Sequence, residues 1–141
     1  QVFYGDEYAM KSSDRSLGHS TLRMPFPLCD EVTAEQQYMF DYQSRLFQWR
    51  KGEPVIHTGR TMHFMSRDNT YAFFRYNDGE AVFVFANASE DNRTIPTAHY
   101  AEILGKYNPV GVDVISGKTY DLSKKDIVIA PLSSIVVKLA K

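Results

Sequence analysis

From residue 60 to the C-terminus, the sequence is a series of short strand-like segments separated by turn residues. Aromatic and apolar residues dominate segments such as 71–76, 81–86 and 135–139. Asn77-Asp78-Gly79 and Ser116-Gly117 lie between such segments, and these residue types tolerate the positive φ of tight hairpins. Six to eight short strands within about 80 residues predict an antiparallel β-sandwich or barrel.

Residues 33–51 are predicted to form one long helix in front of this domain. Thr33 and Gln36 have the spacing of a capping box at its start. Gly52 and Pro54 follow its last turn and end it. Apolar residues recur at intervals of three and four, which is typical of an amphipathic helix: Met39, Tyr42, Leu46 and Trp49.

The residues before this helix combine one strand-like segment with a long irregular stretch. Val2, Phe3 and Tyr4 followed by Gly5 predict a short buried strand that ends in a tight turn. Residues 11–31 have no periodicity and are rich in Ser, Gly and Pro. They predict a loop of about twenty residues, and loops of that length are usually functional.

Composition and charge exclude several classes of protein. Hydrophobic residues make up 43% of the chain and charged residues 23%, as in ordinary globular domains. The formal net charge of -1 predicts neither a nucleic-acid partner nor a membrane-surface partner. No apolar run is long enough for a membrane span. Cys29 is the only cysteine and the four histidines lack ligand spacing, so we expect no disulfide, metal or cofactor.

The order of these segments resembles the last part of the α-amylase family of glycoside hydrolases. Gln1-Val2-Phe3-Tyr4-Gly5-Asp6-Glu7 resembles the end of the last barrel strand in that family, with Phe3 in place of a tyrosine. Leu22-Arg23-Met24-Pro25 and Leu46-Phe47-Gln48-Trp49-Arg50-Lys51 resemble the following loop and last barrel helix. Phe74-Arg75-Tyr76-Asn77 and Asp113-Val114-Ile115-Ser116-Gly117-Lys118 resemble the C-terminal domain of the neopullulanase and cyclomaltodextrinase branch.

The resemblance implies a mainly β fold in two parts. Residues 1–59 would be a remnant of a (β/α)8 barrel, with its last strand at 1–5, a loop at 6–32 and its last helix at 33–51. Residues 60–141 would be an antiparallel β-sandwich, the C-terminal all-β domain.

The resemblance also implies a function. The chain would be the C-terminal portion of a glycosidase of the neopullulanase, cyclomaltodextrinase or α-amylase type, acting on α-glucan or maltodextrin. The three catalytic carboxylates of that family come from barrel strands before the last one, so we expect no catalytic residue here and no activity of the chain alone. The parent enzyme would be soluble and bacterial, in the periplasm or secreted.

Four residues are candidates for residual substrate contacts: Asp6, Glu7, His19 and Arg23. In many family members an Asp four positions before the loop arginine helps to hold a sugar, but His19 stands at that position relative to Arg23. Asp14 could take this role by another loop path, and Arg23 could equally be an ordinary surface or ion-pair residue. Neighbouring Asp6 and Glu7 point to opposite faces of an extended chain, which makes them a poor catalytic pair.

Alternative interpretations involve binding without catalysis. A carbohydrate-binding module could use Tyr71, Phe73 or Tyr120 as a platform, and a third possibility is a β-sandwich that only acts as a scaffold. Asn87 and Asn92 begin matches to the glycosylation pattern. Because the first strand and the helix would lack their barrel partners, we also predict a homodimer or an exchanged strand.

Overall fold

The computed structural model describes residues 2–28 and 30–141, so Gln1 and Cys29 lie outside the described residues. The chain divides into two units, Gln1–Gln48 and Trp49–Lys141, and each is described by itself. About 29% of the residues are in helices and 29% in strands. The fold is therefore mixed, and not mainly β as we predicted, because the N-terminal unit is helical and a helical segment also covers the sheet.

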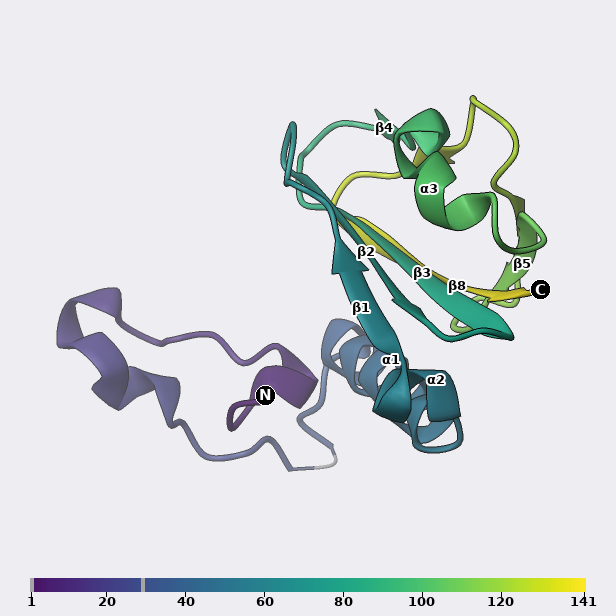
Figure 1. Cartoon of the computed structure of the whole chain (residues 1–141). Helices are drawn as coiled ribbons and strands as arrows, with labels where there is room; N and C mark the ends of the chain where they lie inside the picture. The colour runs from purple at the N-terminus through teal and green to yellow at the C-terminus, as the bar shows by residue number, and fades with distance from the viewer. Residues whose placement is uncertain (1, 29) are drawn as a thin grey trace. The chain divides into compact units, whose positions relative to one another are not determined.

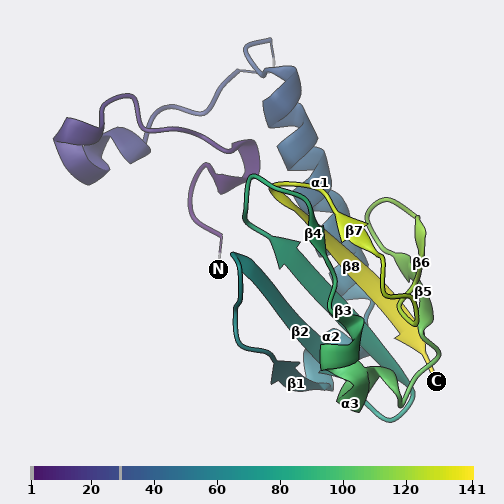
Figure 2. The ribbon, with the colours of Figure 1, turned by 90° about the horizontal axis from the view of Figure 1, so that it is seen from above.

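The second unit is built on a six-stranded antiparallel sheet (Figure 1). The strands follow the order β1-β2-β3-β8-β5-β6. The longest strands, β3 and β8, lie side by side at its centre (Figure 2). The strands are β1 (Arg60–His63), β2 (Thr70–Tyr76), β3 (Glu80–Asn87), β5 (Val110–Asp113), β6 (Thr119–Asp121) and β8 (Ser133–Ala140).

Each predicted hairpin forms, although the positive φ angles fall partly elsewhere. At Asn77, the side-chain oxygen accepts hydrogen bonds from the backbone N–H groups of Gly79 and Glu80, each at 2.9 Å, and closes the β2–β3 turn. Positive φ is found instead at Asp68 (49°) and Asn69 (58°), in the turn between β1 and β2. Gly117, in the turn between β5 and β6, also has a positive φ, of 73°.

One face of the sheet is covered by helical turns and a two-stranded ribbon, and not by a second full sheet. The cover consists of η3 (Thr97–Tyr100), α3 (Ala101–Leu104), β4 (Arg93–Thr94) and β7 (Val128–Ile129). Buried Phe74, Phe83 and Phe85 of the sheet form the core with Tyr100 and Ile103 of the cover. The β-sandwich that we predicted is thus a six-stranded sheet with a mixed second layer, because β4 and β7 pair only with each other.

The opposite face of the sheet carries α2 (Pro54–Thr58), which packs against β2 and β3. Its Val55 is fully buried. Arg75 of β2 donates a hydrogen bond to the carbonyl oxygen of Ile56 at 2.7 Å and another to the Thr61 hydroxyl. These contacts place α2 against the sheet. The domain boundary after residue 59 stays a prediction.

The first unit contains all but the last turn of the predicted helix, α1 (Ala34–Lys51), because the second unit begins at Trp49. Its capping box is formed: the Thr33 N–H donates to Gln36 Oε1 at 2.9 Å, and the Gln36 N–H donates to Thr33 Oγ1 at 3.2 Å. None of its described residues is buried. Among the described residues, no helix is long and apolar enough to cross a membrane.

The N-terminal segment differs from the predicted strand and loop. Residues 2–5 are not in a strand, and they pair with no other strand among the described residues. A 3-10 turn, η1 (Asp6–Tyr8), follows instead. The loop predicted at 6–32 also contains the 3-10 segment η2 (Arg15–Leu22), which is kinked at Gly18.

Candidate functional site

Asp6 and Glu7 use their carboxylates to hold the local backbone. Asp6 Oδ2 accepts a hydrogen bond from the Phe3 N–H at 2.7 Å, and Glu7 Oε2 accepts one from the Gly5 N–H at 3.1 Å. Gly5 itself has φ of 89°, which glycine adopts without strain. The two acids therefore stabilise the turn around Gly5.

His19 and Arg23 are both exposed at the far end of η2. Among residues 2–28 and 30–141, no hydrogen bond or ion pair joins any two of Asp6, Glu7, His19 and Arg23. Asp14 caps η2 by accepting hydrogen bonds from the N–H and hydroxyl of Ser16 at 2.8 and 2.7 Å, and these bonds lower the pKa of Asp14. The structure thus does not bring the four candidate residues together.

An aromatic cluster ties the N-terminal segment to α1 within the first unit. The Tyr8 ring stacks on the Phe40 ring with 5.2 Å between centroids, and Phe26 packs edge-on against Tyr4 at 4.4 Å. Gln43 of α1 also donates a hydrogen bond to the carbonyl oxygen of Asp6 at 2.7 Å. These contacts place the turn at Asp6 and Glu7 against the helix.

The first unit leaves much apolar surface on α1 uncovered. Tyr38 is 64% exposed, and Phe40 and Phe47 are each 37% exposed. Tyr38 and Met39 line a hollow of about 700 Å³ together with Tyr8, Ala9 and other residues around the start of the helix. A helix that carries large apolar side chains and buries none of them lacks partners against which these side chains would pack.

The aromatic residues proposed as a sugar platform lie on two different faces of the sheet. Tyr71 and Phe73 of β2 share the face that carries α2; their rings are 5.8 Å apart, and Tyr71 is 41% exposed. Tyr120 of β6 packs against the core on the other face. The three rings therefore do not form one row.

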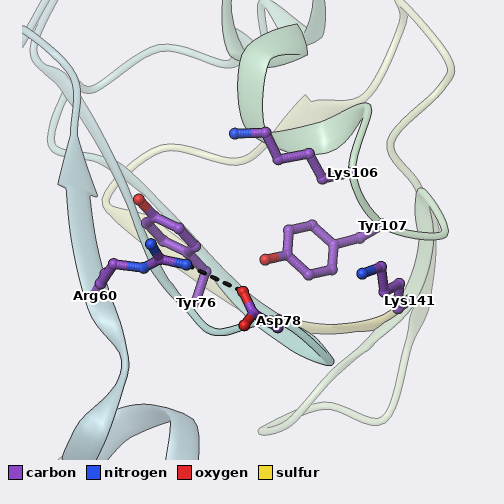
Figure 3. Close-up of a pocket in the computed structure, with 6 residues that line it drawn as sticks. All are labelled: Arg60, Tyr76, Asp78, Lys106, Tyr107 and Lys141. Atoms are coloured by element: carbon purple, nitrogen blue, oxygen red, sulfur yellow. Dashed lines mark hydrogen bonds and ion pairs between the residues drawn. The ribbon is translucent and has the colours of Figure 1, made fainter.

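A hollow of about 320 Å³ lies on the second unit at one end of the sheet (Figure 3). Its lining comes from the start of β1, the β2–β3 hairpin, the segment after α3 and the end of the chain: Arg60, Tyr76, Asp78, Lys106, Tyr107 and Lys141. The sequence does not reveal this group because its members are far apart along the chain. Its only signal was the hairpin at residues 77–79, which brings two of the strands to this end of the sheet.

Arg60 and Tyr107 make the contacts that link the residues of this hollow. The Arg60 guanidinium lies 5.1 Å from the centre of the Tyr76 ring and pairs with Asp78 at 3.1 Å (Figure 3). The Tyr107 hydroxyl donates a hydrogen bond to the carbonyl oxygen of Asn77. Burial raises the pKa of Tyr107, with the charge of Arg60 acting against this rise.

Asn87, the first residue of one glycosylation pattern, is used inside the fold. Its side chain is 2% exposed. The Asn87 Nδ2 atom donates to the carbonyl oxygens of Asp91 and Ala130, each at 2.8 Å. Its Oδ1 accepts from the N–H and hydroxyl of Ser89 at 3.0 and 2.7 Å. An amide in this position is not available as a glycan acceptor in the folded chain, whereas Asn92 is exposed.

The second buried polar residue of note is Asp113, which begins one of the segments on which the resemblance rests. Its Oδ1 accepts from the Val136 N–H at 2.7 Å, and its Oδ2 accepts from the Ser116 N–H at 2.9 Å. Asp113 therefore fixes the β5–β6 turn and links β5 to β8. Within the described part of the chain, no three His, Cys, Asp or Glu side chains group as a metal site.

Comparison with known proteins gives one family match. Residues 61–138 match the model of the cyclomaltodextrinase C-terminal domain. This stretch contains the whole sheet except the ends of β1 and β8.

Several solved glycosidases contain a similar fold. A trehalose-6-phosphate hydrolase from Bacillus licheniformis is 26% identical, with a TM-score of 0.63 over 84% of this chain and 22% of that chain. A cyclic maltosyl-maltose hydrolase from Arthrobacter globiformis is 20% identical, with a TM-score of 0.64 over 99% of this chain and 26% of that chain. An α-amylase from Anoxybacillus is 17% identical, with a TM-score of 0.69 over 97% of this chain and 28% of that chain. The chain thus spans about a quarter of the length of these structures, in their C-terminal portion.

Proposed function

Because the chain belongs to the family of cyclomaltodextrinase C-terminal domains, we propose that it is the C-terminal portion of an α-glucan hydrolase. Residues 60–141 act as the domain that stabilises the catalytic barrel, and residues 1–59 contribute the last part of that barrel. The parent enzyme cleaves α-glucans or maltodextrins in the manner of neopullulanases and cyclomaltodextrinases. It works in the bacterial periplasm or outside the cell.

The observation that carries this proposal is the uncovered apolar surface of α1. Eighteen helical residues contain no buried side chain, although Tyr38, Phe40 and Phe47 are large and apolar. Leaving such a surface in water is costly, at about 25 cal/mol for each Å² of apolar area. A catalytic barrel packed around α1 would cover these side chains, which lie on more than one side of the helix.

The same proposal implies that the chain alone has no glycosidase activity. The two neighbouring carboxylates, Asp6 and Glu7, are both used in hydrogen bonds to the local backbone. A retaining glycosidase needs two carboxyl groups about 5 Å apart on either side of the bond that is cut. We therefore assign the catalytic carboxylates to the barrel of the parent, and give Asp6, Glu7, His19 and Arg23 at most a role in binding substrate there.

A direct test is the release of reducing sugar from pullulan or cyclodextrin by the purified chain. We expect no release above that of a heat-denatured sample. Release that is proportional to the concentration of the chain, and that persists through further purification, would overturn the proposal.

We further propose that the isolated chain associates with itself through the N-terminal segment and α1. Exposed side chains of that unit, Tyr38 among them, would then be shielded by a second copy in place of the barrel.

The alternative role as a carbohydrate-binding module rests on the exposed Tyr71 beside Phe73. Two tilted rings can contact one or two sugar units, whereas the wider platform that includes Tyr120 does not form. Titration with maltotriose decides between the two roles. Binding that Tyr71→Ala removes would favour the module, and no binding favours the stabilising role.

A further inference from the structure

The hollow lined by Arg60, Tyr76 and the residues around them has an unbalanced charge. Three of its six lining residues have cationic side chains, and Asp78 has the single acidic side chain among them. That carboxylate is already paired with Arg60 at 3.1 Å. Figure 3 shows Arg60 and Tyr76 on one side of the hollow, with Lys106, Tyr107 and Lys141 on the other.

The two lysines have no acidic partner in the described residues. Neither Lys106 nor Lys141 takes part in an ion pair, and both are exposed. Their backbones are fixed: the Lys106 N–H donates to the carbonyl oxygen of Ile103 at 3.0 Å, and the Lys141 N–H donates to that of Gly79 at 2.9 Å. The sheet and the segment after α3 thus fix the backbone of two lysines whose side chains line one concave surface.

The aromatic residues of the hollow favour a charged ligand over a neutral sugar. A sugar ring binds by stacking on an open aromatic face, but the Arg60 guanidinium already covers the Tyr76 ring at 5.1 Å. The Tyr107 side chain is largely buried, and its hydroxyl proton is given to the carbonyl oxygen of Asn77. What remains accessible is mainly a set of N–H donors, and these bind oxyanions.

We propose that this hollow binds the phosphate group of a small phosphorylated molecule, with Lys106, Lys141 and Arg60 as its ligands. A phosphate monoester carries close to two negative charges at neutral pH, which matches two unpaired ammonium groups better than a carboxylate does. The volume of about 320 Å³ is at the lower end for small-molecule sites. This site lies in the sheet unit and is independent of the glycosidase role proposed above.

The test is a titration of the ¹⁵N-labelled 141-residue chain, followed by amide chemical shifts, with three probes in separate arms. The probes are inorganic phosphate, glucose 6-phosphate and glucose, all at constant ionic strength. We expect saturable shifts at Lys106, Tyr107 and Gly79 with the two phosphates and none with glucose. Tighter binding of glucose 6-phosphate would identify a sugar phosphate as the ligand, and equal binding would identify the free phosphate ion.

Variants separate this site from general attraction to a basic surface. The double variant Lys106→Gln, Lys141→Gln should weaken phosphate binding about tenfold, since it removes both unpaired charges. The matched control Lys124→Gln, Lys125→Gln removes two exposed lysines elsewhere on the same unit and should leave binding unchanged. An absence of saturable shifts with both phosphates would overturn the proposal, and so would equal binding by the double variant and the wild type, or equal shifts with glucose.

Discussion

The side-chain amide nitrogen of Asn87 lies 2.8 Å from the carbonyl oxygen of Ala130 and donates a hydrogen bond to it. This contact joins the end of the central strand β3 to the residue that follows β7. A second bond from the same nitrogen, to the Asp91 carbonyl oxygen at 2.8 Å, closes the turn that leads to β4. One buried amide therefore anchors both strands of the small ribbon to the large sheet.

Replacement of Asn87 by Ala should lower the free energy of unfolding by about 3 kcal/mol, because it leaves buried carbonyl and N–H groups without partners. Urea denaturation followed by tryptophan or tyrosine fluorescence measures this change. The matched control is Asn92→Ala, in an exposed position of the same loop, which should change stability by less than about 0.5 kcal/mol. Similar effects of the two substitutions would contradict the role given to Asn87.

Asp113→Ala should be similarly destabilising, by about 3 kcal/mol, because the Val136 and Ser116 N–H groups lose a charged acceptor. Asp113→Asn should recover only part of this loss, since the amide offers one acceptor where two are used. Denaturation midpoints of both variants check this order. Asp126→Asn, at an exposed position, serves as the control, and a midpoint for Asp113→Asn equal to wild type would refute the arrangement.

Lys138 predicts a specific loss of stability at alkaline pH. Its ammonium group bonds to Glu53 and lies 3.3 Å from Glu80, and these contacts raise the pKa of Lys138. A lysine whose pKa is higher in the folded state stabilises the fold fully at pH values below its pKa in the unfolded chain, about 10.4. This stabilisation is lost as the pH rises through the pKa of the folded state. Because the side chain is 38% exposed, we expect less than about 1 kcal/mol.

The measurement compares denaturation midpoints between pH 8 and 11 for the wild type and Lys138→Met. At pH 8, Lys138→Met should be less stable than the wild type. Between pH 8 and 11, its stability should fall by less than that of the wild type. Lys124→Met, at an exposed position without an ion pair among the described residues, should follow the wild-type curve. Parallel curves for Lys138→Met and wild type would show that the Glu53–Lys138 contact contributes nothing.

The uncovered surface of α1 predicts self-association. In sedimentation velocity, the wild-type chain should sediment faster as its concentration rises. Tyr38→Lys should reduce this dependence, because it places a charge on the most exposed of the large apolar residues of α1. Gln37→Lys adds the same charge at a neighbouring exposed position and should not. A wild-type monomer at all concentrations would count against the proposed contact.

Local signals in the sequence predicted the elements of the fold that depend on near neighbours. The capping box at Thr33 and Gln36, the helix that follows it and the hairpins at Asn77 and Gly117 all form, because their hydrogen bonds lie within a few residues. The strand at residues 2–5 was wrong for the opposite reason. A strand depends on hydrogen-bonding partners that can lie far away along the chain, and an apolar pattern does not reveal whether such partners are present.

The candidate sites were harder to predict because they depend on long-range contacts. The sequence gives no indication that Arg60, Lys106 and Lys141 line one hollow, since the sheet order brings them together. Likewise, the sequence around Asn87 matches a glycosylation pattern. Its structural role becomes visible only in the fold, where the side chain is buried and donates a hydrogen bond to Ala130. Asp6, Glu7, His19 and Arg23 came from a family resemblance, and their role in substrate binding remains a prediction.

The central claim is that residues 60–141 stabilise the catalytic barrel of an α-glucan hydrolase, and removal of this domain from the parent enzyme tests it most directly. The measurement is the half-life of hydrolytic activity toward pullulan or cyclodextrin at a series of temperatures. It compares the intact enzyme with an enzyme that ends before residue 60. We predict that the shortened enzyme loses its activity at a temperature lower by about 10 °C or more, because the barrel loses a packed neighbour. Equal half-lives and equal initial activity would contradict the account.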